Sequence, residues 1–443
     1  MKIVLILPRG GVYRKKTGAF PIFIRYGPMT LPMLAALIPK ELHAEVELYD
    51  EGVQCIEKEK ITADLIGISS ITGASPRAFA YADYFRSRKI PVVIGGVHAT
   101  LNPDEAAKHA DAIVLGIATA TWPELLKDFS QGKMKSVYGP PDTDQVDFSH
   151  WPVPARKLVY GKAFITINSV QATYGCKNRC EFCVTPYSCK GYHHRPISDV
   201  VDEIRQIKNK YFLFVDPSPI EDTAYAKELY SALIPLKKRW MGCATIRIGQ
   251  DDELLDLAAR SGCRGLLIGF ESISGNTLTS INKNFNSPNK YVEMIKKLHD
   301  KKIAIMGCFV FGLDSDDKDV FKRTVEFVQK NNIDLPRFTV NTPFPGTNYF
   351  DKMKAAGRIT SFNWSCYDAQ HVVIVPTKMT AEELQAGHRW AWHETYKWQS
   401  IAKRLLGSKA ALGTNLLTNA GYHYYSKNLP KYSREVMARD IKI

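Results

Sequence analysis

Three cysteines stand within eight residues near the middle of the chain. Cys176, Cys180 and Cys183 have C-x3-C-x2-C spacing, and Phe182 directly precedes the third thiol. Cysteine thiolates are the usual protein ligands of iron–sulfur clusters, and a 4Fe-4S cluster has four irons to bind. Three thiolates on one short loop would leave the fourth iron open to an outside ligand. The spacing therefore predicts a 4Fe-4S site built for chemistry at the open iron.

Other uses of these thiols stay open. A structural zinc ion could take the three cysteines together with His193 or His194, although zinc sites more often pair two C-x2-C units. An electron-transfer cluster would use a fourth cysteine, and Cys189 follows six residues after the motif. A redox dithiol formed by the last two cysteines would leave the first one without a role.

The surrounding residues predict a strand, a loop and a helix around the motif. Phe164–Ile167 and Val170–Thr173 are rich in β-branched and aromatic residues, which favour strands. Gly175 permits a tight turn before the first cysteine. Residues 197–208 then carry apolar side chains at helical spacing, with Ser198 as the expected N-cap.

In this setting the motif resembles that of the radical S-adenosylmethionine (radical SAM) enzymes. In that family the open iron chelates the amino and carboxylate groups of SAM. Reduction then cleaves SAM to a 5'-deoxyadenosyl radical, which abstracts a hydrogen atom from the substrate. The resemblance implies a 4Fe-4S cluster, SAM and an external electron donor such as a flavodoxin or ferredoxin.

Residues 161–348 alternate strand-like and helix-like segments in six β/α units, too few for a complete eight-stranded barrel. A partial (β/α)6 barrel is the core of radical SAM enzymes, so the resemblance implies that fold. We expect strands, beyond the one that leads into the cysteines, at 212–215, 241–246, 265–269, 303–311 and 337–341, and helices at 198–208, 223–236, 252–261, 289–300 and 318–330.

Side chains at the strand ends of related enzymes bind SAM. By this resemblance we expect SAM contacts at Phe182, Asp216, Arg247, Glu271, Val310 and Gly312. Two departures are visible: Pro217-Ser218 follows the first carboxylate where relatives often have Asp-Asn, and the usual Gly-Gly-Glu segment is missing. Glu271 could instead cap a helix.

Residues 1–145 also alternate, with short apolar strands expected at 2–7, 45–49, 65–69, 92–95 and 112–115. Helices are expected at 32–38, 76–88, 103–109 and 122–129. This order predicts a doubly wound parallel sheet of Rossmann or flavodoxin-like type. The ligand crevice of such a sheet lies beyond the carboxyl ends of its strands.

Small residues crowd the expected strand ends, and small residues let a bulky ligand approach the backbone. The arrangement resembles the cobalamin-binding domain that precedes many radical SAM barrels. It implies cobalamin contacts at Ser70, Thr72, Gly95, Gly96, Val97, His98 and Gly116.

Two features of that domain differ from other cobalamin proteins. The Asp-x-His-x-x-Gly motif, whose histidine ligates cobalt, is absent, and Arg9–Tyr13 stands in its place. Many cobalamin-type radical SAM enzymes lack this histidine too. Gly116–Thr119 replaces the Gly-Glu-x-Glu segment that is common in relatives. The alternative is a domain of the same fold that no longer binds cobalamin.

Residues 146–160 have the composition of a linker, and residues 349–443 predict a mostly helical C-terminal region. Residues 357–373 suggest a loop across the barrel mouth. Thr380 is the expected cap of a long helix over 383–406. Its three tryptophans would pack on the barrel or line an apolar substrate pocket: Trp390, Trp392 and Trp398.

The chain has 443 residues and a formal net charge of +14. Residues 401–443 hold eight Lys or Arg, and this basic tail could contact an anionic membrane surface or an acidic molecule, or simply face solvent. The sequence has no run of 18 apolar residues, so we expect no transmembrane helix. Nine cysteines without a regular framework favour a reducing, cytoplasmic location.

The order of the two domains resembles the cobalamin-dependent (class B) radical SAM methyltransferases, which methylate unactivated carbons. One alternative is a non-methylating radical reaction on the same scaffold, such as cyclisation, ring contraction, oxidation or rearrangement. Another is an RNA-modifying methylthiolating enzyme, which needs three more cysteines upstream, where only Cys55 occurs, and a C-terminal β-barrel. We expect a small-molecule substrate, hydrophobic in character, and no specific nucleic acid.

Overall fold

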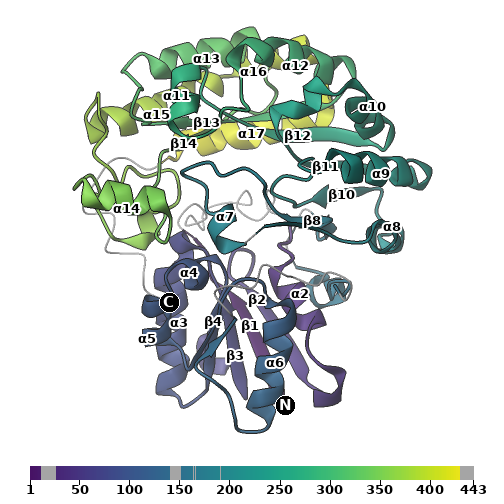
Figure 1. Ribbon diagram of the computed structural model, residues 1–443, viewed down its shortest axis with the longest axis vertical. Helices are drawn as coiled ribbons and strands as arrows, with labels where there is room; N and C mark the ends of the chain where they lie inside the picture. Colours follow the sequence, from purple (N-terminus) through teal and green to yellow (C-terminus); the bar gives the residue numbers. More distant parts are fainter. Residues whose placement is uncertain (11–25, 140–150, 163, 165, 190, 430–443) are drawn as a thin grey trace.

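The computed structural model describes residues 1–10, 26–139, 151–162, 164, 166–189 and 191–429. Two α/β bodies lie one above the other, with the N-terminal sheet below and the barrel above (Figure 1). Of the segments discussed above, residues 11–13, the linker residues 146–150, residue 165 and the last part of the basic tail, 430–443, lie outside the described residues.

The N-terminal sheet has six parallel strands in the order β2-β1-β3-β4-β5-β6. These are β1 (Lys2–Leu7), β2 (Glu45–Asp50), β3 (Leu65–Ser69), β4 (Val92–Gly95), β5 (Ala112–Val114) and β6 (Val137–Tyr138). The strands read as continuous apolar runs because both faces of the sheet are covered. The doubly wound fold is therefore confirmed, with β6 as a short edge strand that the sequence did not indicate.

Helices cover the two faces of this sheet in pairs. Helices α2 (Thr30–Ala36) and α6 (Ala118–Ser130) pack on one face, where they enclose Leu5 and Val93. Helices α3 (Ser75–Ser87) and α5 (Pro103–His109) cover the other face. The chain thus leaves β1 and β3 toward opposite faces, and ligands of such sheets bind where neighbouring strands diverge in this way.

The second body is an open barrel of six parallel strands in the order β14-β13-β12-β11-β10-β7. Its strands are β7 (Ser169–Val170), β10 (Tyr211–Phe214), β11 (Arg239–Ala244), β12 (Cys263–Glu271), β13 (Ala304–Phe311) and β14 (Arg337–Val340). Helices α8 (Ile197–Gln206), α9 (Thr223–Leu233), α10 (Asp252–Arg260), α12 (Pro288–Asp300) and α13 (Val320–Lys330) form its outer layer. The predicted partial (β/α)6 barrel is confirmed.

Helix α8 begins differently from the prediction. Pro196 stands at its N-cap position, and the hydroxyl of Ser198 donates to Asp199 instead of capping the helix. Proline is well suited to a helix start because it lacks the N–H that would be left unpaired there. The N-cap prediction for Ser198 was wrong.

The long helix expected over 383–406 is two helices, α15 (Ala381–Thr395) and α16 (Trp398–Ser408). Thr380 caps the first in a capping box with Glu383, as predicted. The chain turns at Tyr396, whose buried hydroxyl donates to the carbonyl of Pro336 at 2.6 Å. A third helix, α17 (Leu412–Lys427), lies against α15 and α16 (Figure 1).

The tryptophans of this region do not form one stripe. Trp392 is buried and donates from Nε1 to the carbonyl of Phe338 on β14 at 2.9 Å. Trp390 and Trp398 are exposed, so the prediction that all three pack on the barrel was wrong. None of the described helices is long and apolar enough to cross a membrane.

Candidate active site

The three cysteines lie on a loop that is closed at its base by a two-stranded antiparallel ribbon. Strand β8 (Thr173–Gly175) pairs with β9 (Tyr192–His194), and the short helix α7 (Thr185–Ser188) lies between them. Gly175 has φ +82°, and a Cβ there would lie 2.1 Å from the carbonyl oxygen of Gly191. Only glycine therefore fits at the predicted turn before the first cysteine.

The barrel holds this loop from the side as well. The amide of Glu181 donates to the carbonyl of Ile281 at 3.1 Å. The Asn282 side chain donates to the carbonyl of Arg179 at 2.8 Å. Phe182 packs partly buried against the barrel core. These contacts fix the loop to the carboxyl end of the barrel.

The thiols themselves are neighbours. Burial raises the pKa of Cys180 to about 12; the ammonium of Lys283 lowers it, and the other two thiols raise it by repulsion. Cys176 Sγ accepts the amide of Asn178 at 3.4 Å. Among the described residues, no three His, Cys, Asp or Glu side chains stand close enough to hold a metal ion in their present rotamers.

The chemistry of the donor set fits a 4Fe-4S cluster. Three soft thiols share one loop, and an amide already donates to one sulfur, as amides near cluster ligands commonly do. Iron binds thiolates, so cluster assembly must remove the proton that burial keeps on Cys180.

Two candidates for a fourth protein ligand differ in their surroundings. Burial raises the pKa of Cys189 to about 12, and its Sγ lies 3.3 Å from where a side chain at Gly175 would begin. The ring of His194 stacks on Tyr225, with 4.4 Å between ring centres. The stacking of His194 on Tyr225 disfavours this histidine as a zinc ligand.

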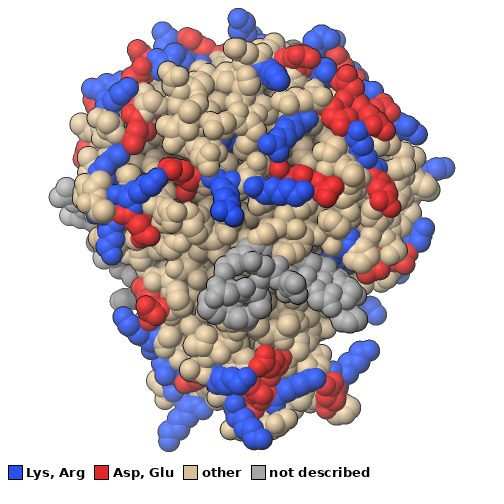
Figure 2. All heavy atoms as spheres, viewed as in Figure 1, with Lys and Arg blue, Asp and Glu red and all other residues tan. Residues whose placement is uncertain are grey.

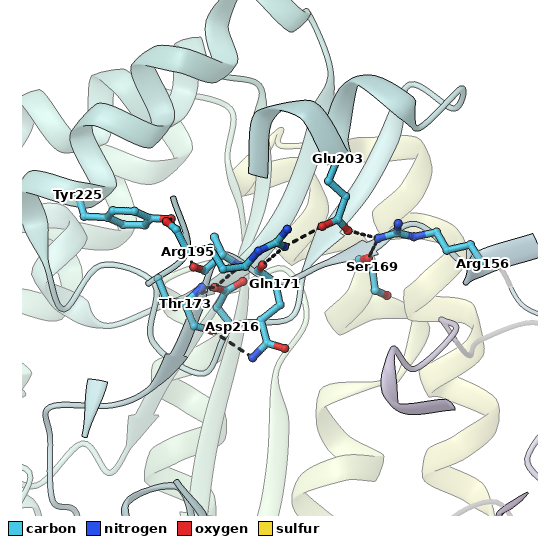
Figure 3. A network of polar contacts seen from close by, with 9 residues as sticks. Arg156, Ser169, Gln171, Thr173, Arg195, Glu203, Asp216 and Tyr225 are labelled. Atoms are coloured by element: carbon cyan, nitrogen blue, oxygen red, sulfur yellow. Dashed lines mark hydrogen bonds and ion pairs between the residues drawn. The ribbon is translucent and has the colours of Figure 1, made fainter. Parts of the chain in front are cut away.

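Asp216 anchors the strand that enters the cysteine loop. Its Oδ1 accepts the amides of Ala172 (2.9 Å) and Thr173 and the Thr173 hydroxyl (2.8 Å) (Figure 3). Burial raises the pKa of Asp216 to about 6, and its Oδ2 is buried without a hydrogen-bond partner. Its expected contact with SAM stays a prediction.

A buried ion network supports the same strand from behind (Figure 3). Arg195 donates to Glu203 and to the carbonyl of Gln171, both at 2.7 Å. Arg156 also donates to Glu203, and to the carbonyl of Ser169. The sequence did not reveal this network because its members are far apart along the chain.

The other expected SAM residues at the barrel mouth already have protein partners. Glu271 has φ +60° and pairs with Lys283 at 2.5 Å. Its helix-capping alternative was wrong, because Ser274 caps the following helix. Arg247 pairs with Glu221 at 3.0 Å and lies 4.9 Å from the centre of the Phe285 ring. Sequence reasoning missed these three partners.

Gly312 is needed for packing as well as for any SAM contact. It has φ +89°, and a Cβ there would lie 2.5 Å from Leu384 on α15. Its amide donates to Asp316 at 3.0 Å. Val310, on β13 two residues earlier, is partly buried against the barrel core. Contacts of both residues with SAM stay predictions.

A cavity of about 410 Å³ opens where the N-terminal sheet meets the barrel. Five of the expected cobalamin residues line it: Ser70, Gly95, Gly96, Val97 and Gly116. Its apolar floor includes Leu5, Gly67 and Trp122. The barrel contributes Gln171, Tyr174, Ser188 and Val215, which belong to the cysteine loop and its neighbouring strand ends. One cavity is thus shared by the two bodies.

The sheet side of this cavity fits a large ligand such as cobalamin. Ser70 Oγ is buried and has no hydrogen-bond partner. Gly96 has φ +93°, and a Cβ there would lie 2.7 Å from Ser69 Oγ. Around Gly116, by contrast, the space is open within 4 Å. An unsatisfied buried polar atom beside an open cavity is a good partner for a bound molecule.

Thr72 and His98 lie behind the cavity wall and do not line it. His98 is fully buried, with Nδ1 3.3 Å from Thr72 Oγ1 and Nε2 3.2 Å from Glu105. Trp364, from the loop expected over the barrel mouth, donates to Glu105 at 2.8 Å. We call these four residues the His98 bridge. It ties the N-terminal domain to the C-terminal region.

The C-terminal region has no small β-barrel: described residues 381–427 form three helices. The RNA-modification alternative therefore lacks its second expected feature.

Comparisons with known proteins agree with this arrangement. Residues 170–328 match the family model "Radical SAM superfamily". The chain is 34% identical over 395 residues to the bacteriochlorophyllide d C-12(1)-methyltransferase of Chlorobaculum tepidum, covering 86% of this chain and 85% of that protein. It is 30% identical over 413 residues to the C-8(2)-methyltransferase of the same organism, covering 89% and 90%.

A solved structure has the same fold. The radical SAM methyltransferase TsrM of Kitasatospora setae, with cobalamin and a 4Fe-4S cluster bound, superposes with a TM-score of 0.65. The match covers 88% of this chain and 81% of TsrM at 17% sequence identity. The chain therefore belongs to the radical SAM enzymes that carry an N-terminal cobalamin-binding-type domain, the class B methyltransferase family.

Proposed function

We propose that this protein methylates an unactivated carbon of a hydrophobic tetrapyrrole of the bacteriochlorophyllide type. One observation carries the proposal: a single cavity is lined by the small-residue strand ends of the N-terminal sheet and by Tyr174 and Ser188, which flank the three cysteines in the chain. A methyl donor on one side and a radical source on the other would both reach a substrate between them. Such enclosure also keeps the radical away from water.

The chain's own residues would divide the work between the two sides. Cys176, Cys180 and Cys183 would hold the cluster, and Asp216 fixes the strand that carries them. Ser70 would donate a hydrogen bond to cobalamin, whose bulk Gly96 and Gly116 admit. When bound, the cluster and SAM supply the radical and cobalamin supplies the methyl group.

The substrate class rests on the relatives and on the character of the cavity. Two relatives that cover most of the chain are named for methylating bacteriochlorophyllide d. The cavity floor is apolar, which suits a flat hydrophobic ring system. The electron donor would be an external flavodoxin or ferredoxin, and a reducing cytoplasm would suit both the cluster and the free thiols. The two relatives named as methyltransferases favour methylation over the non-methylating alternative.

The test is an anaerobic turnover assay. The protein is reconstituted with iron, sulfide and cobalamin and incubated with reductant, methyl-deuterated SAM and bacteriochlorophyllide d. The proposal expects a product in which one hydrogen atom is replaced by a trideuteromethyl group, together with S-adenosylhomocysteine and 5'-deoxyadenosine. The variant Cys55→Ser, at an exposed cysteine far from the motif in sequence, serves as the active control.

Each outcome of this assay has a distinct meaning. Deoxyadenosine with an unmethylated but altered product would support the non-methylating alternative and contradict methyl transfer. Methylation of another tetrapyrrole, but not of bacteriochlorophyllide d, would contradict the proposed substrate and support the proposed reaction.

A further inference from the structure

Helix α17 buries polar side chains and exposes apolar ones. Asn415 and Asn419 are fully buried: Asn415 donates to Asp334 at 3.0 Å, and Asn419 accepts from Arg404 at 3.0 Å. The opposite face carries leucines. A surface helix normally has the reverse pattern. The inverted pattern indicates that the outer face of α17 has a use that its packing inside the protein does not explain.

The outer face is formed by large apolar side chains. Leu412, Leu416, Leu417 and Tyr424 have exposed fractions of 48%, 53%, 74% and 42%. Residues four apart lie on one side of a helix, so Leu412, Leu416 and Tyr424 follow one line along α17.

Neighbouring residues of α16 extend this face. Leu406, two residues before the end of α16, is exposed. Trp398 is exposed too, and its ring lies 4.8 Å from that of His423 on α17. We call the whole set the α16–α17 apolar face: Trp398, Leu406, Leu412, Leu416, Leu417 and Tyr424.

The charged side chains that α16 and α17 carry are all positive. The sequence has no Asp or Glu between Glu394 and Glu435. Within that stretch, Lys403, Lys409 and Lys427 are exposed. Leucine and aromatic side chains flanked by lysines are the composition of helices that lie in the headgroup region of anionic membranes.

We propose that the α16–α17 apolar face docks the protein on an anionic phospholipid surface. The leucines and Trp398 would enter the boundary between headgroups and acyl chains, and the lysines would pair with lipid phosphates. A second copy of the chain is a poorer partner, because a face-to-face contact would bring lysines of like charge together.

When α17 lies on a membrane, the catalytic crevice stays accessible. Asp334, which α17 contacts through Asn415, accepts the amide of Ile305 at the start of β13. Helix α17 therefore packs at the amino ends of the barrel strands, whereas the cysteine loop lies at their carboxyl ends. Docking would hold the protein on the bilayer with the crevice turned away from it.

Helix α12 offers a matched control. Val292 is as exposed as Leu416, at 55%, but it stands among ion pairs such as Lys297–Glu293 and Lys296–Asp300. Side chains of both signs mix over the outer helices of the barrel at the upper right of Figure 2. Such a surface should not attract a bilayer, although single apolar residues are exposed on it.

The experiment is vesicle flotation with the full-length, cluster-loaded protein. Vesicles of phosphatidylcholine mixed with phosphatidylglycerol should carry the protein upward, whereas phosphatidylcholine alone should carry much less. The double variant Leu416→Asp/Leu417→Asp should bind the mixed vesicles at least about tenfold more weakly, because charge on the docking face opposes insertion. Val292→Asp should bind like the wild type.

Other outcomes would overturn the proposal. Iron content and circular dichroism show whether the variants fold, which is expected because the substituted side chains are exposed. Equal binding of the double variant and the wild type would reject this face as the docking site. A wild-type dimer that the double variant dissociates, with no vesicle binding, would assign the face to a second copy. Neither result depends on methyl transfer.

Discussion

The two walls of the crevice are built in opposite ways. The sheet wall, with Ser70, Gly96 and Gly116, consists of small residues, and one buried hydroxyl there has no partner. The barrel wall is backed by a dense polar network in which Asp216 and Glu203 each accept several hydrogen bonds. The barrel wall is therefore held mainly by its own hydrogen bonds, although Asp216 Oδ2 has no partner, whereas the sheet wall mainly offers space.

This difference shows how the protein manages two cofactors of different size. A cluster loop must be held within tenths of an ångström, so its backbone is fixed by buried charges and by Gly175. Cobalamin is large and supplies many contacts of its own, so the sheet wall needs open space more than it needs internal hydrogen bonds. Changes to the barrel wall should therefore unfold or empty the cluster site, and changes to the sheet wall should affect cofactor binding.

Loss of any cluster cysteine should have the largest effect. Cys176→Ala, Cys180→Ala and Cys183→Ala should each abolish formation of 5'-deoxyadenosine, because an incompletely ligated cluster cannot present an open iron to SAM. Iron content and deoxyadenosine after anaerobic reconstitution measure this, with Cys55→Ala as the unaffected control. Full deoxyadenosine formation in any of the three variants would refute the cluster assignment.

Asp216→Ala should be the most damaging change to the barrel wall outside the cysteines. It leaves the amides of Ala172 and Thr173 buried without an acceptor. We expect a loss of about 3 kcal/mol in the free energy of unfolding, since each unpaired buried group costs about 1–3 kcal/mol. Denaturant titration followed by fluorescence measures it. Asp216→Asn keeps one acceptor oxygen, and its stability should stay close to that of the wild type.

The same carboxyl predicts a pH dependence. Burial raises the pKa of Asp216 to about 6, above its ordinary value of 3.8, so the folded protein holds this proton more tightly than the unfolded chain. The contribution of Asp216 to stability is therefore full below about pH 4 and falls as the pH rises to about 6. Unfolding titrations across this range should show the decline in the wild type and not in Asp216→Asn. Identical slopes in both proteins would contradict the assignment.

On the sheet wall, two glycines separate the strain of a positive φ from a collision with the Ser69–Ser70 segment. Both Gly96→Ala and Gly116→Ala should cost about 1 kcal/mol for a positive φ. Only the new Cβ at position 96 would collide, 2.9 Å from the backbone nitrogen of Ser70. Gly96→Ala should therefore weaken cobalamin binding by about tenfold or more, equivalent to at least about 1.4 kcal/mol. The Cβ of Gly116→Ala would enter open space, so this variant should lose less cobalamin than Gly96→Ala, and equal losses in both variants would point to strain alone.

The His98 bridge should give the smallest effect. Trp364→Phe keeps the ring but removes the hydrogen bond to Glu105, worth about 1 kcal/mol. Because the bridge joins the two bodies, we expect more deoxyadenosine per methylated product as their alignment loosens. If the ratio of deoxyadenosine to methylated product stays unchanged while the unfolding midpoint falls, the bridge is a purely structural contact.

The N-terminal sheet could be predicted almost fully from sequence. Strands β3 and β4 match the expected ranges because buried parallel strands are short apolar runs between turn residues. Strand β6 was not predicted because two residues are too few to show a periodic pattern. Only its pairing with β5 defines it. Helix α17 was not predicted because Asn415 and Asn419 face inward. This reverses the usual pattern of apolar residues on the buried face of a helix.

The candidate site was predictable where local spacing encodes it and hidden where distant residues meet. The cysteine spacing and the small residues at strand ends identified both walls. The contact of Trp364 with Glu105 joins residues 259 positions apart, and nothing local indicates it. The same holds for Lys283, which pairs with Glu271, and for Glu203 between its two arginines.

Cobalamin binding tests the central claim most directly. The anaerobically purified, cluster-loaded protein is mixed with hydroxocobalamin, freed of excess cofactor by gel filtration, and assayed by its absorption spectrum. The account predicts a stoichiometric amount of retained cobalamin in the wild type and a marked loss in Gly96→Ala, with iron content and SAM cleavage unchanged in both. Wild-type protein that cleaves SAM but retains no cobalamin would contradict it.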